Sequence, residues 1–260
     1  KIVKNRKIAG YYSMKDDLIN AGAIYTDLPA VVDKHIVTTA HYKDMGPWMS
    51  AVIKNLSKYW MREFNLLDDY PKLDQPRYVS PNLRTIKERI IAGDREKDFF
   101  DGHRNFGYGG FKYDGRWKKV AKKISEEYGI NGNSSFLQLN SEKGFLLKDF
   151  KDLYPKIKLK GFETSNYAIN NTLKEVKEYV SKSSDYTKIN SEDKKYDFVM
   201  ALGVVYTYTI KDSIKVLSEI ERVGKGKSFI TLASYTNNED YWLFKDWTLI
   251  GSTILKKEEW

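Results

Sequence analysis

In the second half of the chain, short apolar runs alternate with segments whose apolar residues recur at helical spacing. The runs occupy residues 134–139, 157–163, 196–203 and 228–232. Strands that alternate with helices are typical of a parallel sheet covered by helices on both faces. The pattern therefore predicts an α/β fold, a Rossmann-like doubly wound sheet, over residues 121–260.

A long amphipathic helix is predicted between the third and fourth of these runs. Asp212 stands where a capping residue is expected, because its carboxylate can accept from the free backbone N–H groups of the first turn. We expect the core face of this helix to consist of apolar residues at helical spacing, namely Ile214, Leu217, Ile220 and Val223.

The first 56 residues form a separate α/β pattern. A short strand is predicted at 7–12, a helix at 14–22, two strands about a tight turn at 30–39, and a final helix at 44–53. We interpret residues 1–56 as one small domain segment.

This segment closely resembles the C-terminal third of the PfpI intracellular protease family. Residues 15–23 and 28–33 carry the resemblance, which implies part of a flavodoxin-like α/β domain. In that family the nucleophilic cysteine, its histidine and the supporting glutamate lie earlier in the fold, and none of those positions exists here. We therefore expect a remnant, or the end of a domain whose first part lies outside this sequence, and no hydrolysis by this chain alone.

Composition excludes several classes of site. The 260 residues include no Cys, which removes disulfides, thiolate metal sites and a cysteine nucleophile. The three histidines form no ligand-spaced cluster, so we expect no metal site and an ordinary surface or hairpin role for His35 and His41. No apolar stretch approaches the roughly 20 residues that span a bilayer, and the N-terminus lacks the form of a secretory signal. We expect a cytoplasmic protein with no membrane span.

The formal net charge of +9 raises the question of nucleic-acid binding. Lysines are interleaved with acids, as in residues 174–178, which is typical of a solvated helix face. This favours a basic, soluble surface over a dedicated nucleic-acid site.

Residues 57–120 differ from both flanking segments. Prolines between residues 70 and 81 indicate a connection, and a short helix is predicted from Asn82 to Ile91. Glycines then alternate with aromatic residues over 101–117, where the chain can bend over a flat ligand and supply stacking faces. Two interpretations stay open: a lid near a cofactor or acceptor, and a loop that packs the N-terminal segment onto the main domain. His103 and Tyr108 are the candidates here for acid–base or acceptor contacts.

Residues 134–147 have the order of an apolar run, a polar turn that closes on Gly144, and a helix, which is how a nucleotide-binding Rossmann unit opens. The stretch resembles the first motif of class I S-adenosylmethionine-dependent methyltransferases, an acid followed by three alternate glycines. In this sequence Gln138 occupies the position of the acid, and Asn140 and Glu142 occupy the positions of the first two glycines. Of the three glycines of the motif, only Gly144 is present. Asn tolerates positive φ, whereas Glu does so with difficulty. The Glu142 carboxylate would also lie close to the carboxylate of the methionine moiety.

The resemblance implies further cofactor contacts. Glu163, at the end of the second apolar run, would bind the ribose, and Asp185, with Tyr186 beside it, would lie at the adenine. Gly144 and Asn140 would hold the methionine end. Methyl transfer then needs alignment of the acceptor, and a base only if the acceptor carries a proton. The residues identify no acceptor.

Three functions remain open on the sequence. The first is an S-adenosylmethionine-dependent methyltransferase. The second is a catalytically inactive methyltransferase fold that serves as a scaffold or interaction subunit, favoured by the altered loop. The third is a basic nucleic-acid-binding protein, for which stacked aromatic residues beside a basic groove are needed. Both ends of the chain look incomplete, so a missing polypeptide or a protein partner is expected to complete them.

Overall fold

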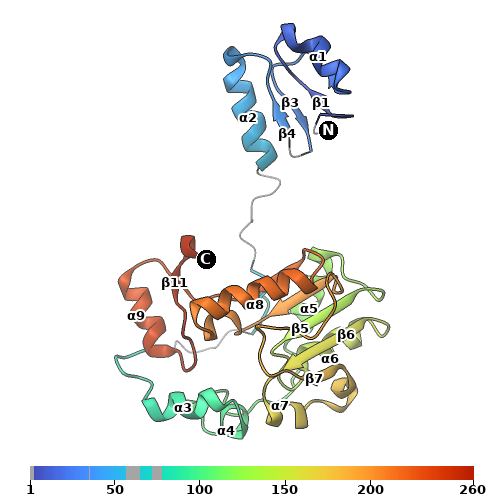
Figure 1. Cartoon of the computed structure of the whole chain (residues 1–260). Coiled ribbons are helices and arrows are strands. Elements are labelled where there is room, and N and C mark those ends of the chain that lie inside the picture. The colour runs from blue at the N-terminus through green and yellow to red at the C-terminus, as the bar shows by residue number, and fades with distance from the viewer. Residues whose placement is uncertain (1–2, 35, 57–64, 72–77) are drawn as a thin grey trace. The chain divides into compact units, whose positions relative to one another are not determined.

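A computed structural model describes residues 3–34, 36–56, 65–71 and 78–260. The chain divides into two compact units, residues 1–64 and 65–260. Each unit is described separately below, with the labels of Figure 1.

The described residues of the first unit form two pairs of short strands and two α-helices. Strand β1 pairs with β2 in parallel, and β3 pairs with β4 as an antiparallel hairpin. The hairpin and both helices confirm the elements predicted at 14–22, 30–39 and 44–53, and the prediction for His35 falls outside the described residues. In order, the elements are β1 (Lys7–Ile8), the 3₁₀ turn η1 (Tyr12–Met14), α1 (Lys15–Asn20), β2 (Ile24–Tyr25), β3 (Val31–Asp33), β4 (Ile36–Thr38), η2 (Tyr42–Asp44) and α2 (Met45–Leu56).

Asp33 at the end of β3 joins the hairpin to β1. Its carboxylate accepts from the backbone N–H of Lys7 at 2.7 Å and pairs with Arg6 at 3.2 Å. Thr38 on β4 accepts from the backbone N–H of Ala9 at 2.9 Å. The two side chains thus accept from backbone N–H groups of β1 and of the residue that follows it, on the side opposite β2.

The second unit alternates strands and helices as predicted. In order, its elements are α3 (Ile86–Asp94), α4 (Lys97–Asp101), η3 (Arg104–Phe106), α5 (Lys118–Tyr128), β5 (Ser135–Leu139), α6 (Phe145–Leu153), β6 (Lys158–Glu163), α7 (Asn166–Asn170), η4 (Lys174–Tyr179), β7 (Val180–Lys182), β8 (Phe198–Ala201), η5 (Val205–Thr207), α8 (Ile210–Val223), β9 (Ser228–Ile230), β10 (Ser234–Tyr235), α9 (Asn238–Trp247), β11 (Leu255–Lys256) and η6 (Lys257–Glu259).

Five of these strands form one parallel sheet in the order β7-β6-β5-β8-β9 (Figure 1). The chain builds the sheet outward from β5 in one direction and then returns to add β8 and β9 on the other side. This is a Rossmann-like doubly wound sheet, and it confirms the predicted fold class. In such sheets ligands bind at the carboxyl ends of the strands, where the order reverses. The segments that follow β5, β6 and β8 are therefore the place to look for a site.

The core lies around the two central strands. All four residues of β8 are buried, as expected for a parallel strand that is covered on both faces. On β5, Phe136 packs against Phe150 of α6 with ring centroids 4.2 Å apart, and against Phe198 of β8 at 5.8 Å. These contacts fix the helix that begins directly after the β5 loop.

Three details of the predicted helices are wrong. Helix α8 is capped by Thr209, whose side chain accepts from the backbone N–H of Asp212, so Asp212 lies in the first turn. Of the predicted core positions on α8, Ile220 and Val223 are buried and Leu217 is half-buried against the core, but Ile214 is 60% exposed. Helix α3 begins at Ile86 and not at Asn82, because Thr85 and Glu88 form a capping box there.

Candidate functional site

The loop between β5 and α6 has the backbone of a glycine-rich loop. The φ angles of Asn140, Glu142 and Gly144 are 58°, 53° and 79°. These are the three alternate positions at which the resembled motif has glycine. Since the left-handed conformation costs a non-glycine residue about 1–2 kcal/mol, the surrounding contacts must hold the loop in this shape.

Gly144 also serves packing. A Cβ at this position would lie 2.9 Å from Cγ2 of Val176 and 3.0 Å from Cγ2 of Thr172. The residue combines a positive φ with a close approach to the segment after β6. Any side chain here would push that segment away from the start of α6.

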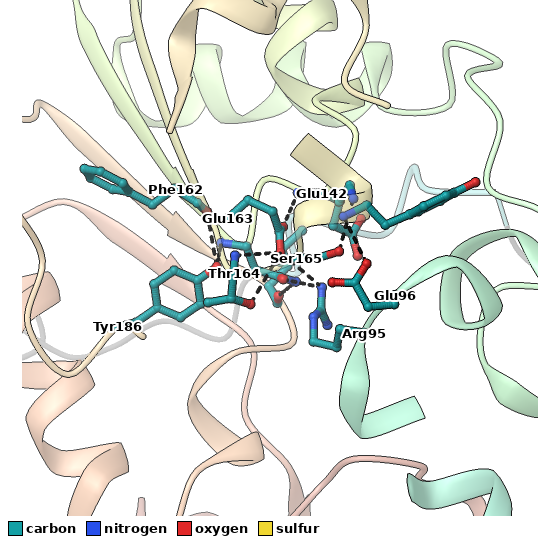
Figure 2. A network of polar contacts seen from close by, with 12 residues as sticks. Arg95, Glu96, Glu142, Phe162, Glu163, Thr164, Ser165 and Tyr186 are labelled. Carbon is teal, nitrogen blue, oxygen red and sulfur yellow. Dashed lines mark hydrogen bonds and ion pairs between the residues drawn. The ribbon is translucent and has the colours of Figure 1, made fainter. Parts of the chain in front are cut away.

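Glu163 at the end of β6 is the main anchor of the loop. Its Oε2 accepts from the backbone N–H of Glu142 at 2.6 Å, and its Oε1 accepts from the N–H groups of Thr164 and Ser165 at 2.8 and 2.9 Å. Figure 2 shows these groups converging on the carboxylate. The Glu163 side chain is fully buried. The residue predicted to bind a ribose thus holds the β5 loop in place, and its ribose contact stays a prediction.

Arg95, just past the end of α3, completes this polar network (Figure 2). Its Nη2 donates to Oδ1 of Asn140 at 2.5 Å and lies 3.8 Å from Oε1 of Glu163. Its guanidinium lies over the rings of Phe99 and Phe100 at 4.9 and 5.7 Å. Burial alone would lower the pKa of Arg95, but the neighbouring carboxylates outweigh it and raise that pKa, so the guanidinium stays charged.

Asp185 and Tyr186 lie in the segment that follows β7. The Tyr186 hydroxyl donates to the carbonyl of Phe162 at 3.2 Å and accepts from the backbone N–H of Asn140 at 3.0 Å. Asp185 accepts from the N–H and hydroxyl of Thr187 at 2.6 and 2.5 Å. Tyr186 therefore joins β5, β6 and the segment after β7, while Asp185 stabilises its own turn.

Glu142 faces the glycine- and aromatic-rich segment. The Tyr108 hydroxyl donates to Oε1 of Glu142. The Tyr108 ring stacks on Phe111 with centroids 4.3 Å apart, and Phe111 stacks on Phe145 of α6 at 4.6 Å. Burial raises the pKa of Glu142 to about 7, against the opposing effects of Arg95 and the Tyr108 hydroxyl. Near neutral pH this carboxyl exists in both protonation states.

An ion pair between a buried lysine and a partly exposed aspartate joins the same segment to the loop. Lys143 Nζ lies 2.5 Å from Oδ2 of Asp101 and donates to the carbonyl of Phe111 at 3.0 Å. Burial opposes ionisation of Asp101, but hydrogen bonds from Lys143, the Phe111 N–H and the Tyr167 hydroxyl outweigh it and lower its pKa to about 2. Residues 101–111 therefore lie directly on the β5 loop, the position that the lid interpretation requires.

Two adjoining cavities open at this end of the sheet. The small cavity, about 330 Å³, is lined by segments that follow β5, β6, β7 and β8, including Asn140, Thr164, Tyr186 and Gly203. The large cavity, about 800 Å³, lies between the β5 loop, the 99–117 segment and the region of α9. Arg95 lines both cavities, so its side chain lies at their boundary.

Among the described residues on the walls of the large cavity, three have a buried polar atom without a hydrogen-bond partner. The atoms are Nε of Arg95, Oε1 of Gln138, at the position of the motif's acid, and the hydroxyl of Ser141. A buried acceptor without a partner costs about 1–3 kcal/mol. A ligand with an N–H or ammonium group in this cavity would remove that cost.

His103 and Tyr108, the two predicted acid–base candidates, have different surroundings. Tyr108 lines the large cavity, whereas His103 is exposed and lines neither cavity. The His103 Nδ1 accepts from the backbone N–H of Asn105 and caps the turn η3. The sequence prediction missed Arg95, since nothing in its local pattern links the end of α3 to the end of β6.

The described part of the chain contains no group of three or more His, Cys, Asp or Glu side chains suited to a metal ion. Nor does any helix in it combine the length and the apolar character required to cross a bilayer.

The N-terminal unit is related to a known family. Residues 1–55 match the model of the DJ-1/PfpI family. Deglycase PfpI of Pyrococcus furiosus is 38% identical over 55 residues, which are 21% of this chain and 33% of that protein. The chain thus spans about a third of the length of the curated relatives that it matches.

The second unit is similar in fold to methyltransferases. A proposed S-adenosyl-L-methionine-dependent methyltransferase of Methanococcus maripaludis has 19% identity and a TM-score of 0.39, covering 48% of this chain and 58% of that one. A SAM-dependent methyltransferase of Aquifex aeolicus has 20% identity and a TM-score of 0.35, covering 46% of this chain and 71% of that one. The family model confirms the PfpI-like resemblance of the N-terminal segment.

Proposed function

We propose that the chain is an S-adenosylmethionine-dependent methyltransferase whose cofactor lies along the β5 loop. The observation that carries the proposal is the backbone of that loop. Asn140 and Glu142 keep the positive φ of the replaced glycines, although neither residue favours it. A loop held in this shape by Glu163 and Tyr186 supports a role in binding a nucleotide-type ligand.

The small cavity suits the adenosine part of the cofactor. It lies at the carboxyl ends of the strands, between the segments that carry Thr164, Tyr186 and Gly203. Gly203 has a φ of 62°, and a Cβ there would meet only the Tyr206 hydroxyl at 3.7 Å. A flat ring system can therefore approach this backbone closely. Asp185, in the segment after β7, is proposed to contact the adenine.

The methionine part suits the adjoining wall of the large cavity. Its ammonium group would find the partnerless Oε1 of Gln138 and the hydroxyl of Ser141. Its carboxylate would be repelled by an ionised Glu142, but a pKa of about 7 allows that carboxyl to take up a proton. The altered motif is therefore compatible with both the ammonium and the carboxylate of the cofactor's methionine part.

The chain's own residues contribute position. S-adenosylmethionine, when bound, supplies an electrophilic methyl group on its sulfonium. Tyr108 donates to the Glu142 carboxyl and so orients it. A protonated Glu142 can donate a hydrogen bond to the cofactor's carboxylate, and a base is needed only if the acceptor itself carries a proton. Arg95 must turn away from Glu163 before Glu163 can contact a ribose, and this movement is the cost of binding in the proposed site.

Calorimetric titration of the purified chain with S-adenosylmethionine and S-adenosylhomocysteine, at two salt concentrations, tests the proposal. We expect binding that depends little on salt and that tightens in Gln138→Glu, because the restored acid pairs with the ligand's ammonium. Lys122→Gln, an exposed change on α5, is the control and should bind like the wild type.

The absence of binding to wild type and Gln138→Glu at millimolar ligand would reject the proposal. The scaffold interpretation would then lead. Steep salt dependence with loss of ligand selectivity would instead indicate binding to the basic surface.

A further inference from the structure

The large cavity is both basic and aromatic. Among the described residues that line it, one is acidic, Glu142. The cationic side chains in its wall are Arg84, Arg95, Arg104, Lys112 and Arg116. Arg95 and Arg116 have carboxylate partners of their own, at Glu163 and Asp114. The remaining arginines are the ones available to a ligand.

Arg84 and Arg104 are neighbours, and no carboxylate of the described residues is bonded to either. Arg84 donates from Nε to the carbonyl of Trp247 and from Nη1 to that of Asn105, at 3.2 and 3.4 Å. Arg104 donates from Nη1 to the carbonyls of Gly107 and Tyr108. Within the described residues, Nη2 of each guanidinium makes no hydrogen bond. These main-chain contacts fix both groups and leave one edge of each free.

The charge of this pair is poorly compensated. Burial lowers the pKa of Arg84, Glu88 opposes that effect, and repulsion from Arg104 and Arg89 adds to it. An oxyanion bonded to Arg84 and Arg104 would relieve the repulsion and accept charge-assisted hydrogen bonds from both. Paired arginines with free edges are well suited to carboxylate or phosphate groups.

Aromatic side chains line the cavity from both sides. Phe99, Tyr108 and Phe111 come from the segment over the β5 loop, and Phe244 and Trp247 come from α9. Their ring faces favour a flat apolar ligand over a sugar or a peptide backbone.

We propose that the methyl acceptor is a small aromatic oxyanion, whose ring lies among these aromatic side chains and whose carboxylate or phosphate is bound by Arg84 and Arg104. Its role as acceptor rests on the proposed methyltransferase function, but its binding does not. The cofactor's ammonium was assigned to Gln138 and Ser141, on the β5 side of the same cavity. The two arginines belong to the α3 side and to η3, so acceptor and cofactor are expected to bind together.

The test is calorimetric titration with four small probes: benzoate, phenyl phosphate, benzamide and benzylamine. The first two should bind, the neutral benzamide should bind about tenfold more weakly, and the cationic benzylamine should bind weakest. Arg84→Gln and Arg104→Gln should each weaken oxyanion binding by about tenfold while leaving benzamide unchanged. Lys122→Gln makes the same change in net charge far from the cavity and should alter nothing.

Three results would overturn the inference. The first is that benzamide binds as tightly as benzoate. The second is that the arginine variants bind benzoate as tightly as the wild type does. Absence of oxyanion binding at tens of millimolar in a chain whose fold is intact by circular dichroism would also reject it.

Titration of the benzoate-saturated chain with S-adenosylhomocysteine separates the two proposals. Unchanged affinity for the nucleoside supports a distinct acceptor site. Competition would assign the arginines to the cofactor and overturn the acceptor assignment. Oxyanion binding without nucleoside binding would leave this site standing and reject the methyltransferase function.

Discussion

The carboxyl groups of Glu142 and Glu163 have opposite surroundings, although the backbone N–H of Glu142 donates to the Glu163 carboxylate. Glu163 accepts from three backbone N–H groups and has Arg95 nearby. Glu142 accepts from one hydroxyl, that of Tyr108, and its pKa is raised to about 7. The first carboxylate is surrounded by fixed hydrogen-bond donors, whereas burial destabilises the anionic form of the second and raises its pKa.

This difference teaches how an altered motif can keep its shape. Glu163 matches the resembled family and holds the loop by accepting the Glu142 N–H. Glu142 departs from that family, and its backbone follows the glycine conformation because Glu163 holds it there. The matching residue therefore carries the geometry, and the departing residue brings new chemistry to the cavity wall.

The largest expected effect is that of Glu163→Gln on stability. The amide has one oxygen where the carboxylate has two, so at least one backbone N–H loses its acceptor and Arg95 loses a charged partner. We expect the free energy of unfolding in urea to fall by about 2–4 kcal/mol.

Glu219→Gln is the matched control for this change. Glu219 also accepts from a backbone N–H, that of Ile189, and pairs with Arg222, but on α8 and away from both cavities. The free energy of unfolding should fall by less in this variant, by about 1 kcal/mol. Equal losses in the two variants would show that Glu163 is an ordinary surface-type acceptor and not the anchor of the loop.

Glu142→Gln should raise the free energy of unfolding, whereas Glu163→Gln lowers it. A carboxyl whose pKa is higher in the folded state binds its proton more tightly there. Its contribution to stability therefore falls as the pH rises from about 4.5 to 7. The variant lacks this titration. It should equal the wild type near pH 4 and exceed it at pH 8 by up to about 3 kcal/mol in the free energy of unfolding.

Urea unfolding of both proteins from pH 4 to pH 8 measures this difference. Other titrating groups, such as Asp101, are common to the two proteins and cancel when the curves are subtracted. A difference that does not change with pH would show that Glu142 titrates like an exposed carboxyl.

The sheet and its strands were predictable because apolar runs report burial on both faces, as in Phe136 to Leu139. Gly144 was predictable because it is the one glycine of the resembled motif that the sequence keeps, and its φ of 79° favours glycine. The exposure of Ile214 on α8 was not predictable, since Val216 and Ile214 are equally apolar and only packing distinguishes them. Arg95 could not be predicted at all, because its partners Asn140 and Glu163 are distant in sequence and brought together by the fold.

A double-mutant cycle on Arg95 sharpens the comparison. Arg95→Met keeps an apolar stem over Phe99 and removes the charge. Combined with Glu163→Gln, it should give a coupling energy of about 1–2 kcal/mol. Combined with Glu142→Gln at pH 5, where Glu142 is already protonated, the coupling should be below about 0.5 kcal/mol. Equal couplings would mean that Arg95 does not distinguish the two carboxylates.

The smallest expected effect belongs to Tyr108→Phe. The lost hydroxyl stabilises the Glu142 anion, so its removal should raise the pKa of that carboxyl by about half to one unit. The pKa is read as the midpoint of the pH-dependent difference between Tyr108→Phe and the double variant with Glu142→Gln. Tyr113→Phe breaks a similar tyrosine–carboxylate contact, at Asp149, and should leave the midpoint unchanged. If both tyrosine variants shift it equally, then general loosening of the aromatic segment controls Glu142, and the Tyr108 hydroxyl has no specific role.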